Sequence, residues 1–210
     1  MLAILHAIIH EFKPVEIVAA VTSLLCVYLT IKNNLWNWAW GLIGSVLYAY
    51  ILWRGGLYAN AGLFGLYFVP MQFVGWYVWL RGGPRKQDDL PVTMLSAEAR
   101  LGWLALTAGL WAALYFFIPP LVVLLHIPPW QLGVWDAFTT ALSISAQYLQ
   151  TYKRWENWVL WIVADLVYTF YLFPHLHLPV TTGLYAIFTV LAFVGAWDWY
   201  RLQSKAAPVR

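Results

Sequence analysis

The sequence predicts an all-α membrane protein of seven transmembrane helices, arranged as two parallel three-helix repeats around one linker helix (3+1+3). Three observations lead to this prediction: the composition, seven apolar stretches of membrane-spanning length, and an internal repeat at a constant offset. Of the 210 residues, 62% are hydrophobic and only 10% are charged, and the mean hydropathy is +0.67. A soluble domain usually carries about 25% charged residues. So few charges could not cover a water-soluble surface, which excludes that class.

Seven stretches approach the roughly 20 apolar residues that a helix needs to cross the hydrocarbon core of a bilayer. They are residues 15–31, 36–53, 59–80, 101–125, 135–152, 157–173 and 179–200. Charges or turn residues such as Lys153 and Arg154 separate one stretch from the next. In the fourth stretch, Pro119 and Pro120 are expected to kink or end the helix, because each proline removes a backbone donor.

These stretches divide the chain into five segments. Residues 1–14 are expected to be a surface segment, because the apolar start is too short and lacks the basic leader of a signal peptide. Residues 15–81 form the first repeat, and residues 82–134 a cytoplasmic loop with the linker helix. Residues 135–201 form the second repeat, and residues 202–210 a cytoplasmic tail.

Lysine and arginine positions predict the orientation, because cytoplasmic loops carry an excess of these residues. On the side of the C-terminus lie Lys32, Arg81, Arg85, Lys86, Arg100, Lys153, Arg154, Arg201, Lys205 and Arg210. The other side carries only Lys13 and Arg54. The sequence therefore places the C-terminus in the cytoplasm and the N-terminus outside.

An internal repeat is visible when residues 15–81 are aligned with residues 135–201, at an offset of 120 without a gap. Matching pairs include Asn37 with Asn157, Trp38 with Trp158, Tyr48 with Tyr168, Gly75 with Gly195, and Trp79 with Trp199. Three helices per repeat would invert a second copy, and the stretch 101–125 restores its orientation. Parallel repeats about an axis along the membrane normal are typical of transporters, with the substrate between the halves near the midplane. Internal symmetry also occurs in proteins that are not transporters, so the repeat favours transport without establishing it.

Polar side chains on the fifth and sixth stretches form two stripes. Each stripe follows the spacing of one helical face, with Asp136, Thr140, Ser143 and Gln147 on one helix and Asn157, Trp161, Asp165 and Tyr168 on the next. Polar groups in lipid are costly, so such residues face the bundle interior or a wet cavity. Two adjacent stripes indicate a shared site. Hydrogen bonding between packed helices is the alternative for Thr140 and Ser143.

Asp165 is the most informative of these residues. It lies roughly 12 Å along the axis of an apolar helix, at about 1.5 Å per residue, and no lysine or arginine lies within the spans to pair with it. It is expected to be protonated, hydrogen-bonded to a neighbour such as Tyr168, or facing a cationic ligand. A purely structural hydrogen-bonding role stays open.

The first repeat carries fewer polar side chains within its predicted spans. Val27 and Ser45 stand where the second repeat has Gln147 and Asp165. The candidate site residues of the first half are Asn37, Trp38, Tyr48, Asn60 and Gln72. The substrate is therefore expected to be recognised mainly by the second half, between the fifth and sixth stretches, with its ring on Trp158 or Trp161.

The run Glu156-Asn157-Trp158…Trp161, with the surrounding stripe residues, closely resembles the bacterial nicotinamide riboside transporter (PnuC) family. The resemblance covers residues 15–81 and 135–201. It implies a fold like that of full-length SWEET sugar transporters, in a multi-pass protein of the bacterial inner membrane. It also implies uptake of an unphosphorylated vitamin by facilitated diffusion, with a cytoplasmic kinase trapping the product. Substrate contacts carry over to Gln147, Asn157, Trp158, Trp161, Asp165 and Tyr168.

One position departs from the family pattern: Phe64 stands where a glutamine is expected early in the third stretch. Related transporters carry thiamine, riboflavin or nucleosides, so the vitamin stays open between nicotinamide riboside and these alternatives. Nicotinamide riboside and thiamine both carry a cationic aromatic ring, which tryptophan faces attract by about 0.5–2 kcal/mol. A neutral flavin would gain less from Asp165.

Other functional classes find less support. A retinal photoreceptor needs a lysine in the seventh stretch, and residues 179–200 contain none. The spans show no nucleophile–base pair and no metal-ligand cluster, so no catalytic residue, metal or cofactor is expected. The basic residues lie in loops, so the net charge of +3 does not indicate nucleic-acid binding. A vitamin sensor that does not transport stays open, as does a homo-oligomeric state.

Overall fold

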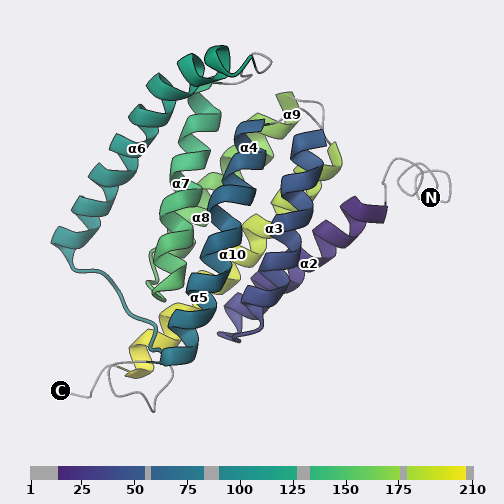
Figure 1. Cartoon of the computed structure of the whole chain (residues 1–210). Helices are drawn as coiled ribbons and strands as arrows, with labels where there is room; N and C mark the ends of the chain where they lie inside the picture. The colour runs from purple at the N-terminus through teal and green to yellow at the C-terminus, as the bar shows by residue number, and fades with distance from the viewer. Residues whose placement is uncertain (1–13, 55–57, 83–89, 127–132, 176–178, 207–210) are drawn as a thin grey trace.

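The computed structural model describes residues 14–54, 58–82, 90–126, 133–175 and 179–206, which form a bundle of helices (Figure 1). The elements are α2 (Pro14–Ile31), α3 (Asn37–Arg54), α4 (Tyr58–Gly62), η1 (Leu63–Phe68), α5 (Val69–Arg81), α6 (Ala97–Leu124), α7 (Gly133–Thr151), α8 (Asn157–Val167), η2 (Tyr168–Leu172), α9 (Phe173–His175) and α10 (Pro179–Ala206). The runs α4-η1-α5 and α8-η2-α9 are each continuous. The described residues therefore form seven helical rods, one for each predicted stretch, which confirms the prediction of an all-α protein with seven helices.

Several predicted features lie outside the described residues. They are most of the surface segment 1–14, including Lys13, the loop charges Arg85 and Lys86, and the end of the tail with Arg210. Among the described helices, four runs are long and apolar enough to cross a membrane: Pro14–Ile31, Asn60–Arg81, Ala97–Leu121 and Thr181–Ser204. The run Asn157–Leu172 is apolar but shorter.

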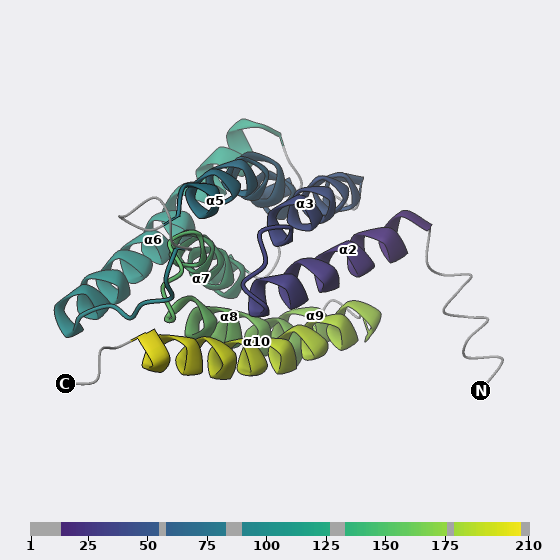
Figure 2. The same cartoon turned by 90° about the horizontal axis from the view of Figure 1, so that it is seen from below.

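Six of the rods form a closed ring. Packing contacts join α2 to α3, α3 to α5, α5 to α7, α7 to α8, α8 to α10, and α10 back to α2. In Figure 2, α3 and α5 lie on one side and α8 and α10 on the other, with α2 and α7 between them. The two halves of the chain therefore meet along two seams, α5 against α7 and α10 against α2.

The helix α6 lies outside this ring, at the edge of the bundle in Figure 1, and packs on α7. The Thr107 and Ser145 hydroxyls, 2.8 Å apart, and the bond from Trp111 Nε1 to the Val134 carbonyl (3.0 Å) join the two helices. The prolines Pro119 and Pro120 do not end the helix, which continues to Leu124. The ribbon bends towards that end (Figure 1), so a kink replaces the termination, as expected where prolines remove donors near an exposed helix end.

Two wide helical turns interrupt the third and sixth rods, and the sequence analysis did not predict them. The π-helical segments Leu63–Phe68 and Tyr168–Leu172 each end two residues before a proline, Pro70 and Pro174. Proline cannot donate to the preceding turn, and the Val69 N–H bonds five residues back, to the Phe64 carbonyl. Such π-turns often occur at functional sites.

The turns that follow α2 and α7 have the same backbone geometry at an offset of 120 residues. Asn33 and Lys153 both have positive φ, 56° and 49°. The N–H groups of Asn34 and Arg154 bond back to the carbonyls of Leu29 and Leu149, each over 2.9 Å. These bonds satisfy carbonyls that a helix end otherwise leaves free.

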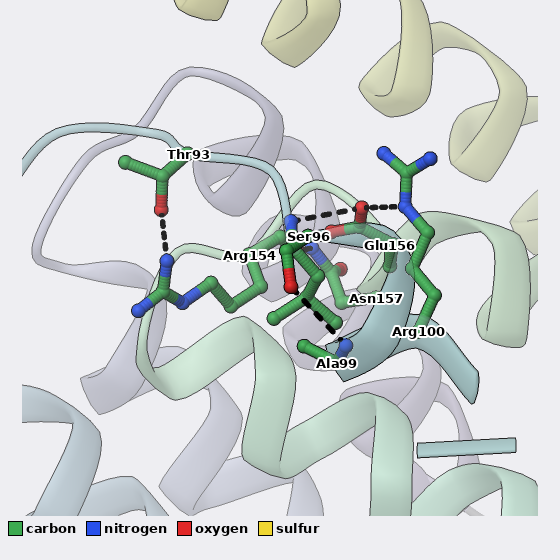
Figure 3. A network of polar contacts seen from close by, with 8 residues as sticks. Thr93, Ser96, Ala99, Arg100, Arg154, Glu156 and Asn157 are labelled. Carbon is green, nitrogen blue, oxygen red and sulfur yellow. Dashed lines mark hydrogen bonds and ion pairs between the residues drawn. The ribbon is translucent and has the colours of Figure 1, made fainter. Parts of the chain in front are cut away.

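The segment before α6 is anchored on the second of these turns (Figure 3). Thr93 forms an isolated parallel bridge with Arg154, and its hydroxyl accepts a bond from the Arg154 guanidinium (2.7 Å). Glu156 Oε1 accepts from the Leu95 N–H (3.1 Å) and from Arg100 Nε (2.9 Å). The linker is therefore fastened to the start of α8.

Candidate functional site

The polar stripes of α7 and α8 lie inside the ring of helices. Asp136, Ser143 and Gln147 are buried on α7, and Thr140 is half-buried. On the neighbouring rod, Asp165 and Tyr168 are buried and Trp161 is half-buried. Tyr168 forms side-chain hydrogen bonds with Thr139 and Ser143. The structure thus brings the two predicted stripes together, with Thr139 as an additional member.

Aromatic rings from the first half reach this cluster. Tyr48 packs on Phe64 (ring centroids 5.5 Å apart), Phe64 on Phe68 (4.9 Å), and Phe68 on Trp161 (6.3 Å). Phe64 and Phe68 belong to the π-helical segment η1, where Phe68 is buried and Phe64 is half-buried. A continuous row of rings therefore crosses from α3 to α8.

Two glutamine side chains stand on opposite sides of the α5–α7 seam. Gln72 Oε1 and Gln147 Nε2 are buried, and neither has a hydrogen-bond partner among the described residues. Tyr67 donates to the Ile144 carbonyl (2.7 Å) and Trp79 Nε1 to the Thr151 carbonyl (3.1 Å). Gln72 and Gln147 lie between these two bonds along their helices, at similar height. A buried polar group without a partner costs about 1–3 kcal/mol, so each of these two atoms would be stabilised by a polar partner.

Further polar contacts extend the site along the α7 seam. Asn60 Nδ2 donates to Asp136 Oδ1 (3.2 Å), and Trp161 Nε1 donates to Gln150 Oε1 (3.0 Å). The second bond fixes the Trp161 ring at the α7–α8 contact. Among the described residues, no group of three or more His, Cys, Asp or Glu side chains is placed to hold a metal ion.

Asn37 and Asn157 lie away from this cluster, at the starts of α3 and α8. Their Nδ2 atoms donate to the Asn34 and Arg154 carbonyls, over 2.7 Å and 2.6 Å. Both side chains are fully buried, and both Oδ1 atoms lack a hydrogen-bond partner within the described ranges. In this conformation the two asparagines hold the turns that precede their helices.

Trp38 and Trp158 also have packing partners of their own. A Cβ on Gly75 would lie 2.3 Å from the Trp38 ring, and one on Gly195 would lie 2.5 Å from the Trp158 ring. Each ring therefore fits closely against a glycine in the third helix of its own half. Of the tryptophans expected at the site, Trp161 is the one that reaches the aromatic row, through Phe68, and it also donates to Gln150 of α7.

Known proteins resemble this chain in both sequence and fold. A sequence profile for the family described as nicotinamide mononucleotide transporter matches residues 13–201. The chain belongs to this family of membrane transporters. The nicotinamide riboside transporter PnuC of Escherichia coli (strain K12) is 27% identical over 208 residues, covering 90% of this chain and 86% of that protein. PnuC of Neisseria mucosa is 34% identical over 170 residues, covering 78% and 62%.

A solved structure of a family member agrees with the fold. The crystal structure of the vitamin B3 transporter PnuC matches with a TM-score of 0.75 at 26% identity, over 97% of this chain and 88% of that one. The family resemblance predicted from the sequence is confirmed. The family is one of transporters and not of enzymes.

Several residues of this transporter site were missed by the sequence analysis. Tyr185 of α10 packs on Tyr168, with ring centroids 4.8 Å apart, and Gln150 binds Trp161. Phe68 is buried between Phe64 and Trp161. Gln150 lies three residues after Gln147, so extending the polar stripe by one turn would have found it. The aromatic residues gave no such signal, because rings occur throughout these helices.

Proposed function

We propose that this chain carries nicotinamide riboside across the inner membrane of a bacterium, through a site between its two halves. The observation that carries the proposal is that three features lie on packed helices of the bundle: buried amide atoms of Gln72 and Gln147 without a partner among the described residues, the aromatic row, and the buried Asp165 carboxylate. The relatives that cover nine tenths of the chain are named for this substrate.

The chemistry of nicotinamide riboside fits these side chains. Its cationic pyridinium ring stacks on Trp161, which also contacts Phe68. Such a cation–π contact contributes about 0.5–2 kcal/mol. Asp165 is the buried carboxylate of the adjacent turn and balances the ring's charge. Gln72 and Gln147 bind the carboxamide or the ribose hydroxyls. Trp158 belongs to the cluster on which Trp161 packs. It is not itself the stacking surface, because Gly195 and Trp199 already cover its ring.

The transport path follows from the arrangement of the halves. We place the chain in the membrane as seven spans in 3+1+3 parallel repeats, SWEET-like, with the N-terminus outside and the C-terminus in the cytoplasm. Support comes from the matching turns at Asn33 and Lys153 and from the three hydrogen bonds along the third and fifth rods, which run parallel. A reporter fused at Arg210 is expected to be cytoplasmic, and a periplasmic signal would overturn this orientation.

Transport is expected to be facilitated diffusion, with net uptake driven by a cytoplasmic kinase that phosphorylates the vitamin. The decisive experiment uses the purified full chain in liposomes. Counterflow of labelled nicotinamide riboside against an internal pool is expected in the wild type and lost in Trp161→Ala. Binding without counterflow would instead identify a sensor.

Thiamine is the second candidate substrate, because it too carries a cationic aromatic ring. Phe64 is the observation that keeps thiamine a candidate. Its apolar ring packs on Tyr48 and Phe68 at a position where the family pattern has an amide. Thermal shifts measured with nicotinamide riboside, thiamine and riboflavin separate the candidates. A shift with thiamine alone would reassign the substrate and leave the site in place.

A further inference from the structure

Four buried tryptophans meet at the end of the bundle that carries Lys32, Arg100 and Arg154, here called the basic end. This tryptophan quartet consists of Trp38, Trp79, Trp158 and Trp199, with exposed fractions of 1%, 6%, 2% and 0%. Trp38 packs edge-on against Trp79 (5.2 Å, 87°), Trp79 lies beside Trp199 (6.3 Å, 48°), and Trp158 packs edge-on against Trp199 (5.4 Å, 89°). The rings form one unbroken row across the two halves.

The two central rings bind the opposite half, each with one hydrogen bond. Trp79 Nε1 of α5 donates to the Thr151 carbonyl of α7, and Trp199 Nε1 of α10 donates to the Thr30 carbonyl of α2, both over 3.1 Å. The third helix of each half is thus tied to the end of the first helix of the other. An ion pair between Lys32 and Asp198 (3.2 Å) lies beside the second bond.

The two outer rings belong to their own halves. Trp38 packs against Gly75 and Trp158 against Gly195, both at distances that leave no room for a Cβ. Each half therefore holds a pair of perpendicular rings as one body. Within the row the contact between the bodies is the Trp79–Trp199 pair, which is flanked by the two carbonyl bonds and by the Lys153 ammonium over the Trp79 ring (4.2 Å). A separation of the halves would part the row at this one place.

The tryptophan quartet lies between the candidate site and the basic end. Thr151 is one turn from Gln147 of the site, and Thr30 is one turn from Cys26, which lies beside Gln72 at Gly41; the two hydroxyls donate to the Gln147 and Cys26 carbonyls over 3.0 Å and 2.9 Å. On α5, Trp79 lies two turns beyond Gln72. A solute leaving the site towards the basic end, along the interior of the ring, meets these rings first.

We propose that the tryptophan quartet is the gate that closes the transport path at the basic end. It rests on the proposed function, in which the substrate passes between the halves. The rings seal the path because they are buried. The interactions that cross the seams at this level include the two indole–carbonyl bonds, the largely exposed Lys32–Asp198 ion pair (3.2 Å) and the Lys153 ammonium over the Trp79 ring (4.2 Å). Each of the two bonds contributes only a modest net free energy, since water replaces it when the seam opens. Trp79 and Trp199 are the gate residues, and Trp38 and Trp158 position them.

The single cysteine of the chain provides a native reporter for this gate. Cys26 is free, and its Sγ would lie 3.0 Å from a Cβ on Gly41, beside the Gln72 amide. It is therefore on the site side of the quartet. The experiment measures the rate at which a membrane-impermeant thiol reagent labels Cys26 in vesicles of both orientations. Arg201→Cys in a Cys26→Ala background identifies the vesicles that expose the basic end, because Arg201 is exposed there.

Trp79→Phe and Trp199→Phe remove the indole donor and keep an aromatic ring. Each is expected to raise the labelling rate from the basic end roughly two- to tenfold, the factor that one net hydrogen bond supplies, and the double variant more than either. Trp111→Phe is the matched control, because it deletes an indole–carbonyl bond of 3.0 Å on α6, outside the quartet. Its labelling rate is expected to equal that of the wild type.

Unchanged labelling in the double variant, or an increase from the opposite end only, would overturn the gate. An equal increase in Trp111→Phe would do the same, because it would indicate general loosening. The measurement needs no substrate. A failure of nicotinamide riboside to bind or move would therefore overturn the proposed function and leave the gate result standing.

Discussion

At the residue scale, the two halves differ through an exchange of a large and a small side chain. Gly41 and Gln72 of the first half correspond, at an offset of 120, to Trp161 and Ala192 of the second. A Cβ on Gly41 would lie 2.5 Å from Gln72 Oε1, so the glutamine fills the space beside the glycine. Trp161 instead packs against the cluster that contains Ala192. In the proposed site this exchange sets an amide on one side and an indole on the other, which suits an asymmetric ligand.

Trp161→Ala is expected to weaken nicotinamide riboside binding about five- to 150-fold, because losing a well-packed aromatic contact costs roughly 1–3 kcal/mol. Trp158→Ala reports on packing instead, so its main effect is expected on the unfolding temperature. Titration calorimetry on both purified variants, beside Trp103→Ala on α6, separates binding from stability. Wild-type affinity in a folded Trp161→Ala protein would remove this residue from the site.

Gly195→Ala is expected to destabilise the protein by about 1–3 kcal/mol, the usual cost of overpacking. The added methyl would lie 2.5 Å from ring atoms of Trp158, which cannot withdraw from a closely packed contact. Gly183→Ala in the same helix is the control, because nothing lies within 4 Å of its Cβ position. Thermal unfolding in detergent measures both, and equal unfolding temperatures would show that the Trp158 contact is loose.

At the element scale, the seven helices could be predicted because apolar length and charged breaks repeat along the chain. The π-helical turns at Leu63–Phe68 and Tyr168–Leu172 could not, although Pro70 and Pro174 stand just after them. A proline signals a lost hydrogen bond, but neighbouring helices decide whether the chain kinks, widens or ends there. Of the two outcomes predicted at Pro119 and Pro120, a kink or an end, α6 shows the kink and continues to Leu124 (Figure 1).

The anchoring of the linker at Glu156 is also a property of elements. Glu156→Ala is expected to cost about 1–3 kcal/mol, because the half-buried Leu95 N–H and the Arg100 guanidinium both lose their acceptor. Glu156→Gln keeps an acceptor oxygen and is expected to cost less. Lys32→Ala is the control: its ion pair with Asp198 is largely exposed, with side-chain exposures of 53% and 31%, and such pairs contribute about 0–1 kcal/mol. Thermal unfolding of all three variants in detergent ranks them, and equal losses would contradict this account of the anchor.

At the scale of the whole molecule, the internal repeat predicted which helices correspond but not how the halves meet. The offset of 120 residues reappears in the turns at Asn33 and Lys153 and in the tryptophans packed on Gly75 and Gly195. The crossing bonds of Trp79 and Trp199 were not predictable, because they join residues that no sequence spacing connects. Trp158 is a predicted site residue that packs against Gly195, and in the proposed account it supports the bundle and does not stack on the substrate.

Transport by the whole molecule is expected to need neither ATP nor an ion gradient, because the chain carries no nucleotide-binding motif and Asp165 is the acid deepest within its apolar stretches. In this account Asp165 balances the charge of the pyridinium ring and carries no proton across. Uptake of labelled nicotinamide riboside into ATP-free liposomes without any ion gradient tests this, with the double variant Trp79→Phe and Trp199→Phe as a carrier whose gate opens more easily. The wild type is expected to equilibrate the label to equal concentrations inside and outside. Uptake that stalls without a gradient and recovers with a proton or sodium gradient would make Asp165 a coupling site, and Asp165→Asn would then abolish the gradient response.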